Sequence, residues 1–232
     1  NITNVTLNNV TGVANYINFT LFNSTNPTYI NFTNLLDGTY FFNVTGNDTA
    51  GNRNNSFVTR TVTVDTIFPS LSYVGRTDAN NSYVARNFII VEVNSTDTNF
   101  NFTNITLFNA TSSAIVRSNQ TFSVADFGSN STDVALYLNF TSLADGTYFF
   151  NVTGNDTAGN SNKTLLTRTI VVDTTNPLLT YGTTTDANGS YVGRNFIIVN
   201  VTVTELNLNI TNVTLNNVTG GANYSNLTLF NS

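Results

Sequence analysis

The chain has 232 residues, of which 40% are hydrophobic and only 9% are charged, and its formal net charge is -5. It contains no Cys, Met, His or Trp, which excludes disulfides, zinc sites built from Cys and His, and catalytic thiolate or imidazole groups. The low charge provides no basic stripe for nucleic acid and no polybasic patch for anionic lipid, and no run of 18 apolar residues is present.

The chain begins with a segment that it repeats at its end. Residues 1–24 return at 209–232 with only three differences. Because both ends carry the same part of a repeat, we expect the array to continue with further copies beyond both ends.

A second set of matches gives the period of the array. Residues 37–52 recur without change at 145–160, which is 108 positions later. The segment 4–7 matches 104–107 at an offset of only 100, so the second copy carries about eight additional residues, between Phe108 and Ala144. Repeats of about 100–108 residues approach the size of an independent domain.

The order of residues predicts strands almost throughout. Short runs rich in Val, Ile, Thr, Phe and Tyr alternate in polarity and are separated by Asn, Asp and Gly, and no run of helical periodicity competes with them. The strands predicted for the one complete repeat, in chain order, are 69–74, 88–96, 102–111, 133–141, 148–154 and 165–172, with one or two more within 115–127. This count predicts an all-β sandwich.

Alternation assigns the faces of these strands. In the segment 148–152, Tyr148, Phe150 and Val152 are predicted to point into the core, while Phe149 and Asn151 point outward. The same rule places a further set of aliphatic and aromatic residues in the core: Ile105, Leu107, Leu136, Leu138, Phe140, Ile197, Val199 and Val201. The sequence therefore predicts two-faced sheets.

Three segments carry a family resemblance. The sequence LADGTY at 143–148 ends one strand and opens the next, NDTAGN follows at 155–160, and VDTTNP at 172–177 closes the repeat. Together they resemble the tandem immunoglobulin-like (Ig-like) repeats of archaeal and bacterial cell-surface proteins. The resemblance covers the whole chain and implies a fold, but it does not by itself give a biochemical function.

Particular aromatic positions fit this resemblance. Tyr148, and Tyr40 in the preceding copy, occupy the place of the tyrosine-corner residue of Ig-like domains. Phe150 and Phe42 stand two positions later, where antibody domains have their second Cys. Because the core Trp is also missing, the resemblance is to the wider superfamily and not to antibody-type domains.

The repeat boundaries divide the chain into three predicted parts. Residues 1–65 form the C-terminal part of an Ig-like domain, 66–173 a complete domain, and 174–232 the N-terminal part of the next. A domain-swapped or strand-donating subunit, in which 174–208 of one copy completes 1–65 of another, would give the same pattern. Since 209–232 would then compete with 1–24 for one position, we favour an arbitrary cut through a longer array.

The chain contains 27 Asn-x-Ser/Thr sequons, whereas random order would give roughly ten. Abundant Asn and Thr alternating in strands would raise this count without any sugar, but the sequon Asn falls on the outward face wherever a face was assigned. Sugars would also keep a nearly uncharged surface soluble. The sites predicted to be glycosylated include Asn4, Asn18, Asn31, Asn43, Asn94, Asn104, Asn139, Asn151, Asn200, Asn212 and Asn226.

Most acidic residues recur with the repeat and lie in turn-like sequences. In an Ig-like sandwich the turns of Asp78 and Asp145 lie at the same pole as Asp173, facing the loop of Glu205, and four carboxylates could bind Ca²⁺. Asp and Asn beside Gly are also ordinary turn formers, and no Asp-x-Asp-x-Asp motif is present. We therefore predict no required metal and no other cofactor, with these four residues as the candidate Ca²⁺ ligands.

Catalysis is difficult to build from the remaining residue types. Ser with a Lys base, or a pair of carboxylates, remains possible, but Lys163 is the only lysine. We predict no catalytic residues.

Certain hydrophobic residues are predicted to face solvent in each repeat. They are Phe41, Phe88, Ile90, Phe149 and Phe196. They could form a stripe for lateral or end-to-end packing of chains, stack on sugars, or be covered by the inserted segment 115–127.

Together these features predict an extracellular, non-enzymatic structural protein of a cell surface, most simply an archaeal one. It would be a glycosylated rod of tandem Ig-like domains in a filament, stalk, adhesin shaft or envelope layer, with other copies of itself and covalent glycans as partners. No nucleic acid partner and no membrane insertion of this segment are expected. The alternative is a carbohydrate-binding or partner-binding module that uses exposed aromatics and loops.

Overall fold

The computed structural model describes residues 2–9, 15–21, 30–55, 58–123, 133–163, 165–217 and 224–229. These residues form strands, turns and loops, and none of them is helical, which confirms the all-β fold class. The chain separates into two compact units, Asn1–Val172 and Asp173–Ser232. The division into three repeat parts remains a prediction.

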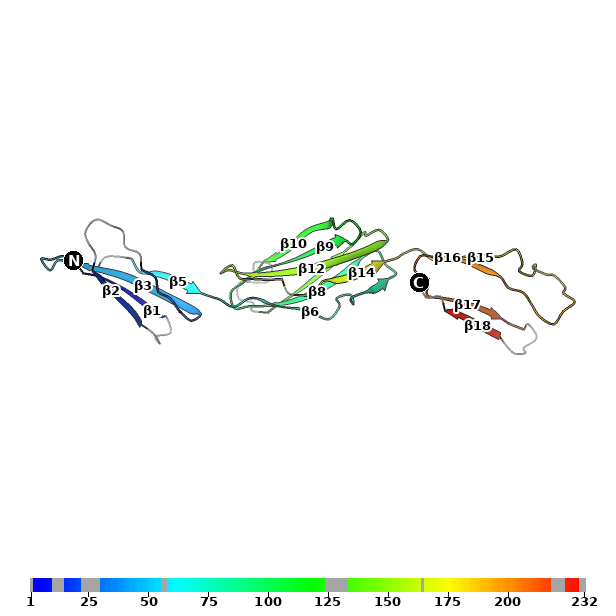
Figure 1. Ribbon diagram of the computed structural model, residues 1–232, viewed down its shortest axis with the longest axis horizontal. Helices are drawn as coiled ribbons and strands as arrows, with labels where there is room; N and C mark the ends of the chain where they lie inside the picture. The colour runs from blue at the N-terminus through cyan, green and yellow to red at the C-terminus, as the bar shows by residue number, and fades with distance from the viewer. Residues whose placement is uncertain are drawn as a thin grey trace. The chain divides into compact units, whose positions relative to one another are not determined.

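The C-terminal part of the first unit, called the central sandwich below, is a β-sandwich of two sheets (Figure 1). One sheet has the strand order β10-β9-β12-β14-β7, with β13 paired to β12, and the other has the order β11-β8-β6. All pairs are antiparallel except β14 with β7. The strands are β6 (Ser70–Tyr73), β7 (Ser82–Val84), β8 (Ile89–Thr96), β9 (Phe100–Asn109), β10 (Ile115–Ser123), β11 (Asp133–Phe140), β12 (Gly146–Asp156), β13 (Ser161–Asn162) and β14 (Arg168–Val172).

The six strands predicted for the complete repeat are confirmed, with ends displaced by at most a few residues. The additional strand predicted within 115–127 is β10, and the part of that prediction beyond Ser123 lies outside the described residues. Alternation did not predict β7 and β13, because strands of three and two residues are too short to show it.

The core confirms the predicted faces. Burial alternates residue by residue along β8 and β12, as the period of two requires. Ile105, Leu107 and Phe150 are fully buried between the sheets, whereas Phe149 is only partly buried. Full burial of such a side chain contributes about 1.5–3 kcal/mol, so the alternating residues supply most of the stability of this sandwich.

The two sheets meet closely where β6 crosses β12. The rings of Tyr73 and Phe150 pack edge to face, with centroids 5.6 Å apart and planes at 88°. A Cβ atom placed on Gly154 would lie 2.8 Å from Cδ2 of Leu71, closer than real contacts allow. Glycine at this position therefore lets Leu71 reach the facing strand.

Both predicted tyrosine-corner positions make the expected type of hydrogen bond. The Tyr148 hydroxyl donates to the carbonyl oxygen of Ala144 at 2.9 Å, and the Tyr40 hydroxyl donates to that of Leu36 at 2.7 Å. Both tyrosines are buried. Each bond ties the start of a strand to the turn that precedes it.

The N-terminal part of the first unit is a single sheet with the order β2-β1-β3-β4, in which β5 also pairs with β3. It repeats the arrangement of β10, β9, β12, β13 and β14. Its strands are β1 (Ile2–Asn9), β2 (Asn15–Leu21), β3 (Gly38–Asn47), β4 (Arg53–Asn54) and β5 (Arg60–Val64).

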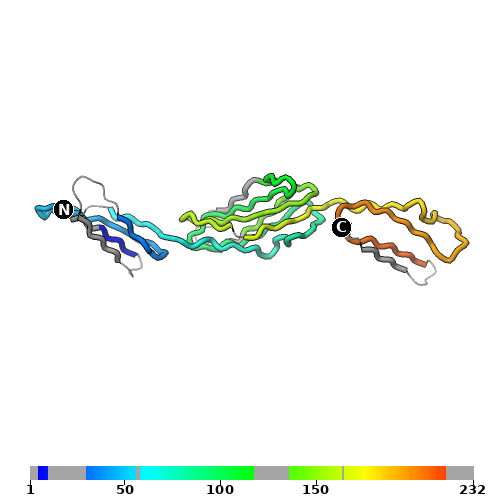
Figure 2. The backbone as a smooth tube through the Cα atoms, in the orientation of Figure 1, coloured from blue at the N-terminus to red at the C-terminus, as the bar shows by residue number. Residues whose placement is uncertain are grey.

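The second unit consists of two strand pairs, and Figure 2 traces the first pair and the first strand of the second pair in yellow to orange. They are β15 (Leu178–Tyr181) with β16 (Val201–Thr204), and β17 (Ile210–Leu215) with β18 (Tyr224–Leu229). Ile197 and Val199 were predicted to lie in the core, but they are 54% and 42% exposed. Ile198, which lies between them, is 41% exposed, so burial does not alternate here, and no second layer packs on these residues within the described part of this unit.

Candidate functional site at the linker

Three carboxylates from three separate turns meet where the chain enters the sandwich. Asp65 follows β5, Asp97 follows β8, and Asp156 ends β12. One oxygen from each lies within 4.8 Å of the other two, and no other three acidic residues in the described part of the chain come this close. Asp97 and Asp156 are buried, and Asp65 is partly buried. These three residues are called the acidic cluster below.

Asn99, two residues after Asp97, donates hydrogen bonds to two members of the acidic cluster. The Asn99 amide Nδ2 donates to Oδ2 of Asp65 at 2.7 Å, and the Asn99 backbone N–H donates to Oδ1 of Asp97 at 2.6 Å. The backbone N–H of Ile67 donates to the other oxygen of Asp65 at 3.1 Å. Asp65 is thus fastened to the sandwich and to its own turn.

The loop after β12 holds the linker, residues 65–69, from the other side. Asp156 Oδ1 accepts the backbone N–H groups of Gly159 and Asn160 at 2.7 and 2.8 Å, which fixes the loop. The Asn160 Nδ2 then lies 2.7 Å from Asp156 Oδ2 and 3.0 Å from the backbone oxygen of Asp65. The next amide along the chain, that of Asn162, donates to the Pro69 carbonyl at 2.7 Å.

Burial raises the pKa of Asp97 above the ordinary value of 3.8, and the charges of Asp65 and Asp156 raise it further. The hydrogen bond from the Asn99 N–H acts in the opposite direction but does not cancel these effects. Asp97 therefore holds its proton more tightly than an exposed aspartate does.

Parts of the same arrangement recur in the other repeats. In the second unit the Asn207 amide donates to Asp173 Oδ2 at 2.7 Å, 108 residues after the Asn99 to Asp65 bond. In the N-terminal sheet, Asp48 accepts the Asn52 amide at 2.7 Å and the Asn52 backbone N–H at 2.8 Å. These bonds lower the pKa of Asp48, led by the side-chain bond from Asn52.

The spacing between the carboxylate oxygens of the acidic cluster suits a hard cation such as Ca²⁺. Most of these oxygens, however, already accept hydrogen bonds from N–H groups. Two oxygens on opposite sides of Ca²⁺ lie about 4.6–5.2 Å apart, because each Ca–O distance is about 2.3–2.6 Å. Five of the six carboxylate oxygens, however, accept N–H hydrogen bonds. These hydrogen bonds attach the linker to the sandwich.

The residues of the acidic cluster differ from the predicted calcium ligands. Asp78 lies in a turn outside the acidic cluster. It forms an ion pair with Arg86 there, and its Oδ2 accepts the Ile90 backbone N–H at 2.9 Å. Asp173 and Glu205 occupy, in the second unit, the repeat positions of Asp65 and Asp97. The joint site of Asp78, Asp145, Asp173 and Glu205 remains a prediction.

The predicted glycosylation sites fall into three groups. The side chains of Asn31, Asn139, Asn200 and Asn212 are exposed, and those of Asn43, Asn94, Asn104 and Asn151 are partly buried. The side chains of Asn4, Asn18 and Asn226 lie outside the described residues. Occupancy of these sites remains a prediction.

The predicted outward aromatics are packed against neighbours on their own face. Phe149 stacks on Phe108, with ring centroids 4.8 Å apart and planes at 9°. The guanidinium of Arg86 lies over Phe88 at 4.3 Å, and that of Arg194 over Phe196 at 4.8 Å. The remaining two, Phe41 and Ile90, are partly buried.

Comparison with solved structures gives a weak structural likeness. The chain is similar to a crystal structure described as a tetra-tandem repeat in the extending region of a large adhesion protein, with 20% identity and a TM-score of 0.38. The match covers 98% of this chain and spans 55% of that one. No family model matches the chain, and no curated protein does. The described residues contain no helix capable of crossing a membrane.

Proposed function

We propose that this chain is an extracellular structural protein, a glycosylated rod of tandem Ig-like repeats in a cell-surface filament, stalk or envelope layer. The strand order supports the Ig-like assignment. The sheet β11-β8-β6 corresponds to strands E, B and A of an Ig-like sandwich, and β10-β9-β12-β14 corresponds to C′, C, F and G.

The observation that supports the structural role is the set of hydrogen bonds that attach the linker to the sandwich. The Asn99 to Asp65 bond recurs as the Asn207 to Asp173 bond, each at 2.7 Å. In a spacer, every linker between repeats should be held by the same contacts. In a binding module, the residues of the binding site would differ from repeat to repeat. Pro69 also fixes its own φ angle and restricts its neighbour, which limits bending of the linker.

The stiffness of the joint can be measured by single-molecule energy transfer. Because the chain has no native Cys, dyes can be placed on Thr61→Cys and Thr141→Cys, on either side of the linker. We expect a narrow distance distribution that broadens in Asn160→Ala, since three oxygens lose their amide donor. The exposed Asn195→Ala serves as the control. An equally broad distribution in every variant would contradict a stiff joint.

The sugar coat is tested by glycopeptide mass spectrometry on protein from its native source. We expect sugars at Asn43, Asn104, Asn139, Asn151 and Asn200. Occupancy should be highest at the exposed Asn139 and lowest at Asn200, because the Asn200 amide donates to Thr184 Oγ1 at 2.9 Å. If these five residues are bare, the sequon excess is compositional.

A second candidate function is binding of a carbohydrate or a protein partner. The observation in its favour is the Phe108 and Phe149 stack, which lies on the outer face of the sandwich. Sugar rings pack on such aromatic surfaces. Chemical-shift changes confined to these two rings on titration with a glycan panel, and lost in Phe149→Ala, would favour this function over a spacer.

A further inference from the structure

Three sequons of the central sandwich share a second feature of their sequence. An aromatic residue stands two positions before the asparagine, and a threonine stands two positions after it. The segments are FTNIT at 102–106, YLNFT at 137–141 and FFNVT at 149–153, and FFNVT also occurs at 41–45 in the preceding repeat. They are called the aromatic sequons below.

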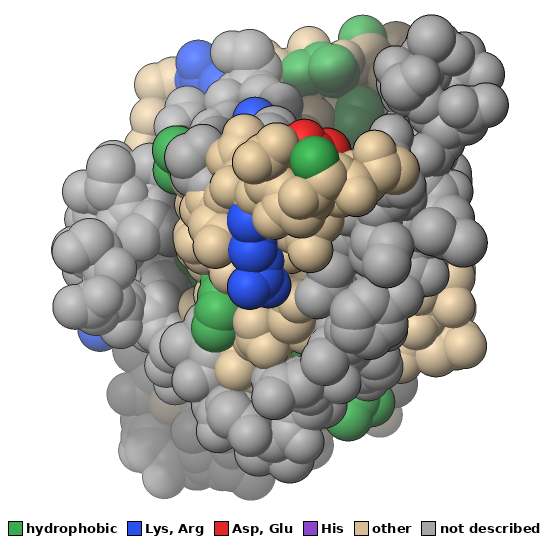
Figure 3. All heavy atoms as spheres, turned by 90° about the vertical axis from the view of Figure 1, so that its left-hand side faces the viewer, with side chains coloured by type: hydrophobic (Ala, Val, Ile, Leu, Met, Phe, Trp, Pro, Cys, Tyr) green, Lys and Arg blue, Asp and Glu red, His purple; other side chains and the backbone are tan. Residues whose placement is uncertain are grey.

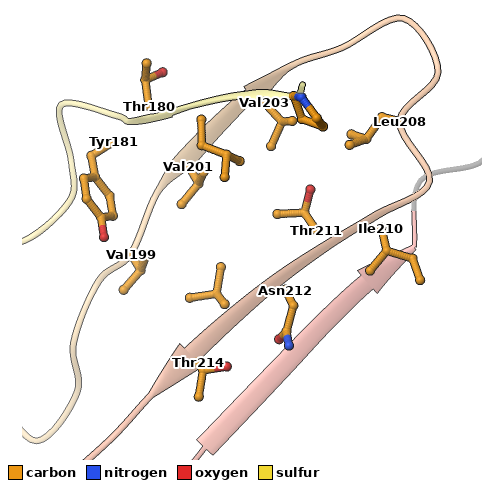
Figure 4. Close-up of a pocket in the computed structure, with 13 residues that line it drawn as sticks. Thr180, Tyr181, Val199, Val201, Val203, Leu208, Ile210, Thr211, Asn212 and Thr214 are labelled. Atoms are coloured by element: carbon orange, nitrogen blue, oxygen red, sulfur yellow. The ribbon is translucent and has the colours of Figure 1, made fainter. Parts of the chain in front are cut away.

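A spacing of two residues places side chains on one face of a strand. Figure 4 shows this alternation in β17, where Ile210, Asn212 and Thr214 point to one side of the strand and Thr211 points to the other. In each aromatic sequon, the ring, the asparagine and the threonine therefore share a face.

In the central sandwich this shared face is the outer one. The fourth residue of each aromatic sequon is buried in the core, and these residues are Ile105, Phe140 and Val152. The rings lie on the opposite side of their strands. Tyr137 is 46% exposed, and Phe102 and Phe149 are partly buried. Each ring thus stands beside its asparagine on the surface of a sheet.

This spacing suits a contact between the ring and a sugar on the asparagine. Two residues along a strand are separated by about 6–7 Å, so the first sugar of a glycan reaches the ring of its own strand. A pyranose sugar has a face of C–H groups. Packing of that face on an aromatic ring removes apolar surface from water.

We propose that the aromatic residue two positions before each of Asn104, Asn139 and Asn151 is the surface on which the first sugar of that asparagine's glycan packs. The proposal rests on the proposed glycosylation and names the residue that holds each sugar. The sugar is covalently attached and contacts its own strand, unlike the free glycan of the second candidate function.

The strand register directs two of these glycans away from each other. Asn151 of β12 opposes Thr106 of β9, which lies two residues from Asn104. The two asparagines are therefore diagonal neighbours, about 7–8 Å apart. Because the strands are antiparallel, Phe149 and Phe102 lie at opposite ends of this group. Each sugar that packs toward its own ring moves away from the other, so both sites can be occupied.

Two of the rings already contact a neighbouring side chain. Phe149 stacks on Phe108, with centroids 4.8 Å apart, and the Arg76 guanidinium lies 5.5 Å from the centre of the Tyr137 ring. A ring that its neighbours already position loses little freedom when a sugar packs on it.

Other outward sequons have no ring at this position. Glu92 stands two residues before Asn94 in β8, and Ile210 stands two residues before Asn212 in β17. A glycan at these asparagines has no aromatic partner two residues before it in its own strand. We therefore expect its first sugar to be more mobile than the first sugar at Asn139.

Double-mutant cycles on the full chain, made in a host that glycosylates it, test the pairing of ring and sugar. We expect Tyr137→Thr to lower the thermal midpoint by about 2–4 °C more in the glycosylated chain than in Asn139→Gln, which carries no sugar beside the ring. Threonine keeps the strand propensity of this exposed position. The matched control is Tyr137→Thr with Asn151→Gln, on the opposite sheet, whose effects should add.

Nuclear magnetic resonance gives a direct readout of the contact. We expect nuclear Overhauser effects between the ring protons of Tyr137 and the C–H protons of the first sugar at Asn139. These effects should disappear in Tyr137→Thr while the sugar remains attached.

Mass spectrometry of the same samples separates this contact from glycosylation itself. Sugars at Asn139 and Asn151, with an additive Tyr137 and Asn139 cycle and no Overhauser effects to the ring, overturn the contact and leave the glycosylated rod intact. Bare asparagines at both sites overturn the contact and the sugar coat together. Equal coupling in the crossed control also overturns the contact, because the effect of the sugar would then not be local.

Discussion

At the residue scale, Asp97 is a carboxylate whose charge is unfavourable. It is buried, and the charges of Asp65 and Asp156 lie nearby. Because its pKa is raised in the folded state, the folded chain binds the Asp97 proton more tightly than the unfolded chain does. This favourable term is fully present below pH 3.8 and is lost as the pH rises through the folded pKa.

Replacing Asp97 by Asn removes this titration while keeping an oxygen for the Asn99 N–H. We expect Asp97→Asn, in the presence of a chelator, to raise the thermal midpoint at pH 7 by about 2–4 °C. The difference should disappear below pH 3.8, where both side chains are neutral. Thermal melts followed by circular dichroism across pH 3–7 provide the measurement, and a lower midpoint for Asp97→Asn at pH 7 would contradict the assignment.

At the element scale, the crossing of β6 over β12 depends on a missing side chain. Leu71 occupies the space where a Cβ of Gly154 would lie, at 2.8 Å. Since Gly154 stands inside a strand and not in a turn, its role is close approach of the two sheets.

We expect Gly154→Val to destabilise the sandwich by about 1–3 kcal/mol, because the added side chain would displace Leu71 from its contact with the facing strand. Chemical denaturation gives the change in the free energy of unfolding. The control is the double variant Leu71→Ala with Gly154→Val, which should be more stable than the sum of the two single changes predicts. Additive losses would show that Leu71 and Gly154 do not share this contact.

The strands of the sandwich could be predicted from the sequence because their burial alternates in register with their polarity. The residues of β8 and β12 show this most clearly. The sheet order could not be predicted from alternation, because pairings such as β14 with β7 join segments far apart in the chain. Nor could alternation predict that Ile197 and Val199 stay exposed, since exposure depends on what covers a face.

The acidic cluster was missed because its residues come from three separate turns. A usable signal was nevertheless present in the repeats. Asp65 and Asp97 are acidic again as Asp173 and Glu205, and Asp156 is acidic again as Asp48. The sequence interpretation grouped the acidic turns by an assumed pole of the fold, whereas the structure joins the turns that surround the linker.

At the scale of the whole molecule, the surface has little charge with which to repel other molecules. In the described part of the end that Figure 3 shows, a few charged and hydrophobic side chains lie among backbone atoms and other side chains. With 8 basic and 13 acidic residues in the chain, charge alone provides weak protection from association. Glycans at outward Asn residues would add this protection without disturbing the core.

Removal of divalent cations tests what holds the linker. Because five of the six carboxylate oxygens of the acidic cluster accept N–H hydrogen bonds, we expect EDTA to leave the thermal midpoint of the chain within about 2 °C of its value in Ca²⁺. A loss of many degrees that Ca²⁺ reverses would instead identify Asp65, Asp97 and Asp156 as metal ligands.

The parallel pairing of β7 with β14 has a mechanical consequence. Ser82, Tyr83 and Val84 face Ile170, Val171 and Val172 in register, and β7 lies near the start of the sandwich while β14 ends it. Tension applied through the two ends of the sandwich pulls these strands in opposite directions along their length. Their hydrogen bonds are then loaded in shear and must break together, whereas bonds in a peeled hairpin break one after another. A chain under load would therefore resist extension most strongly at this pair of strands.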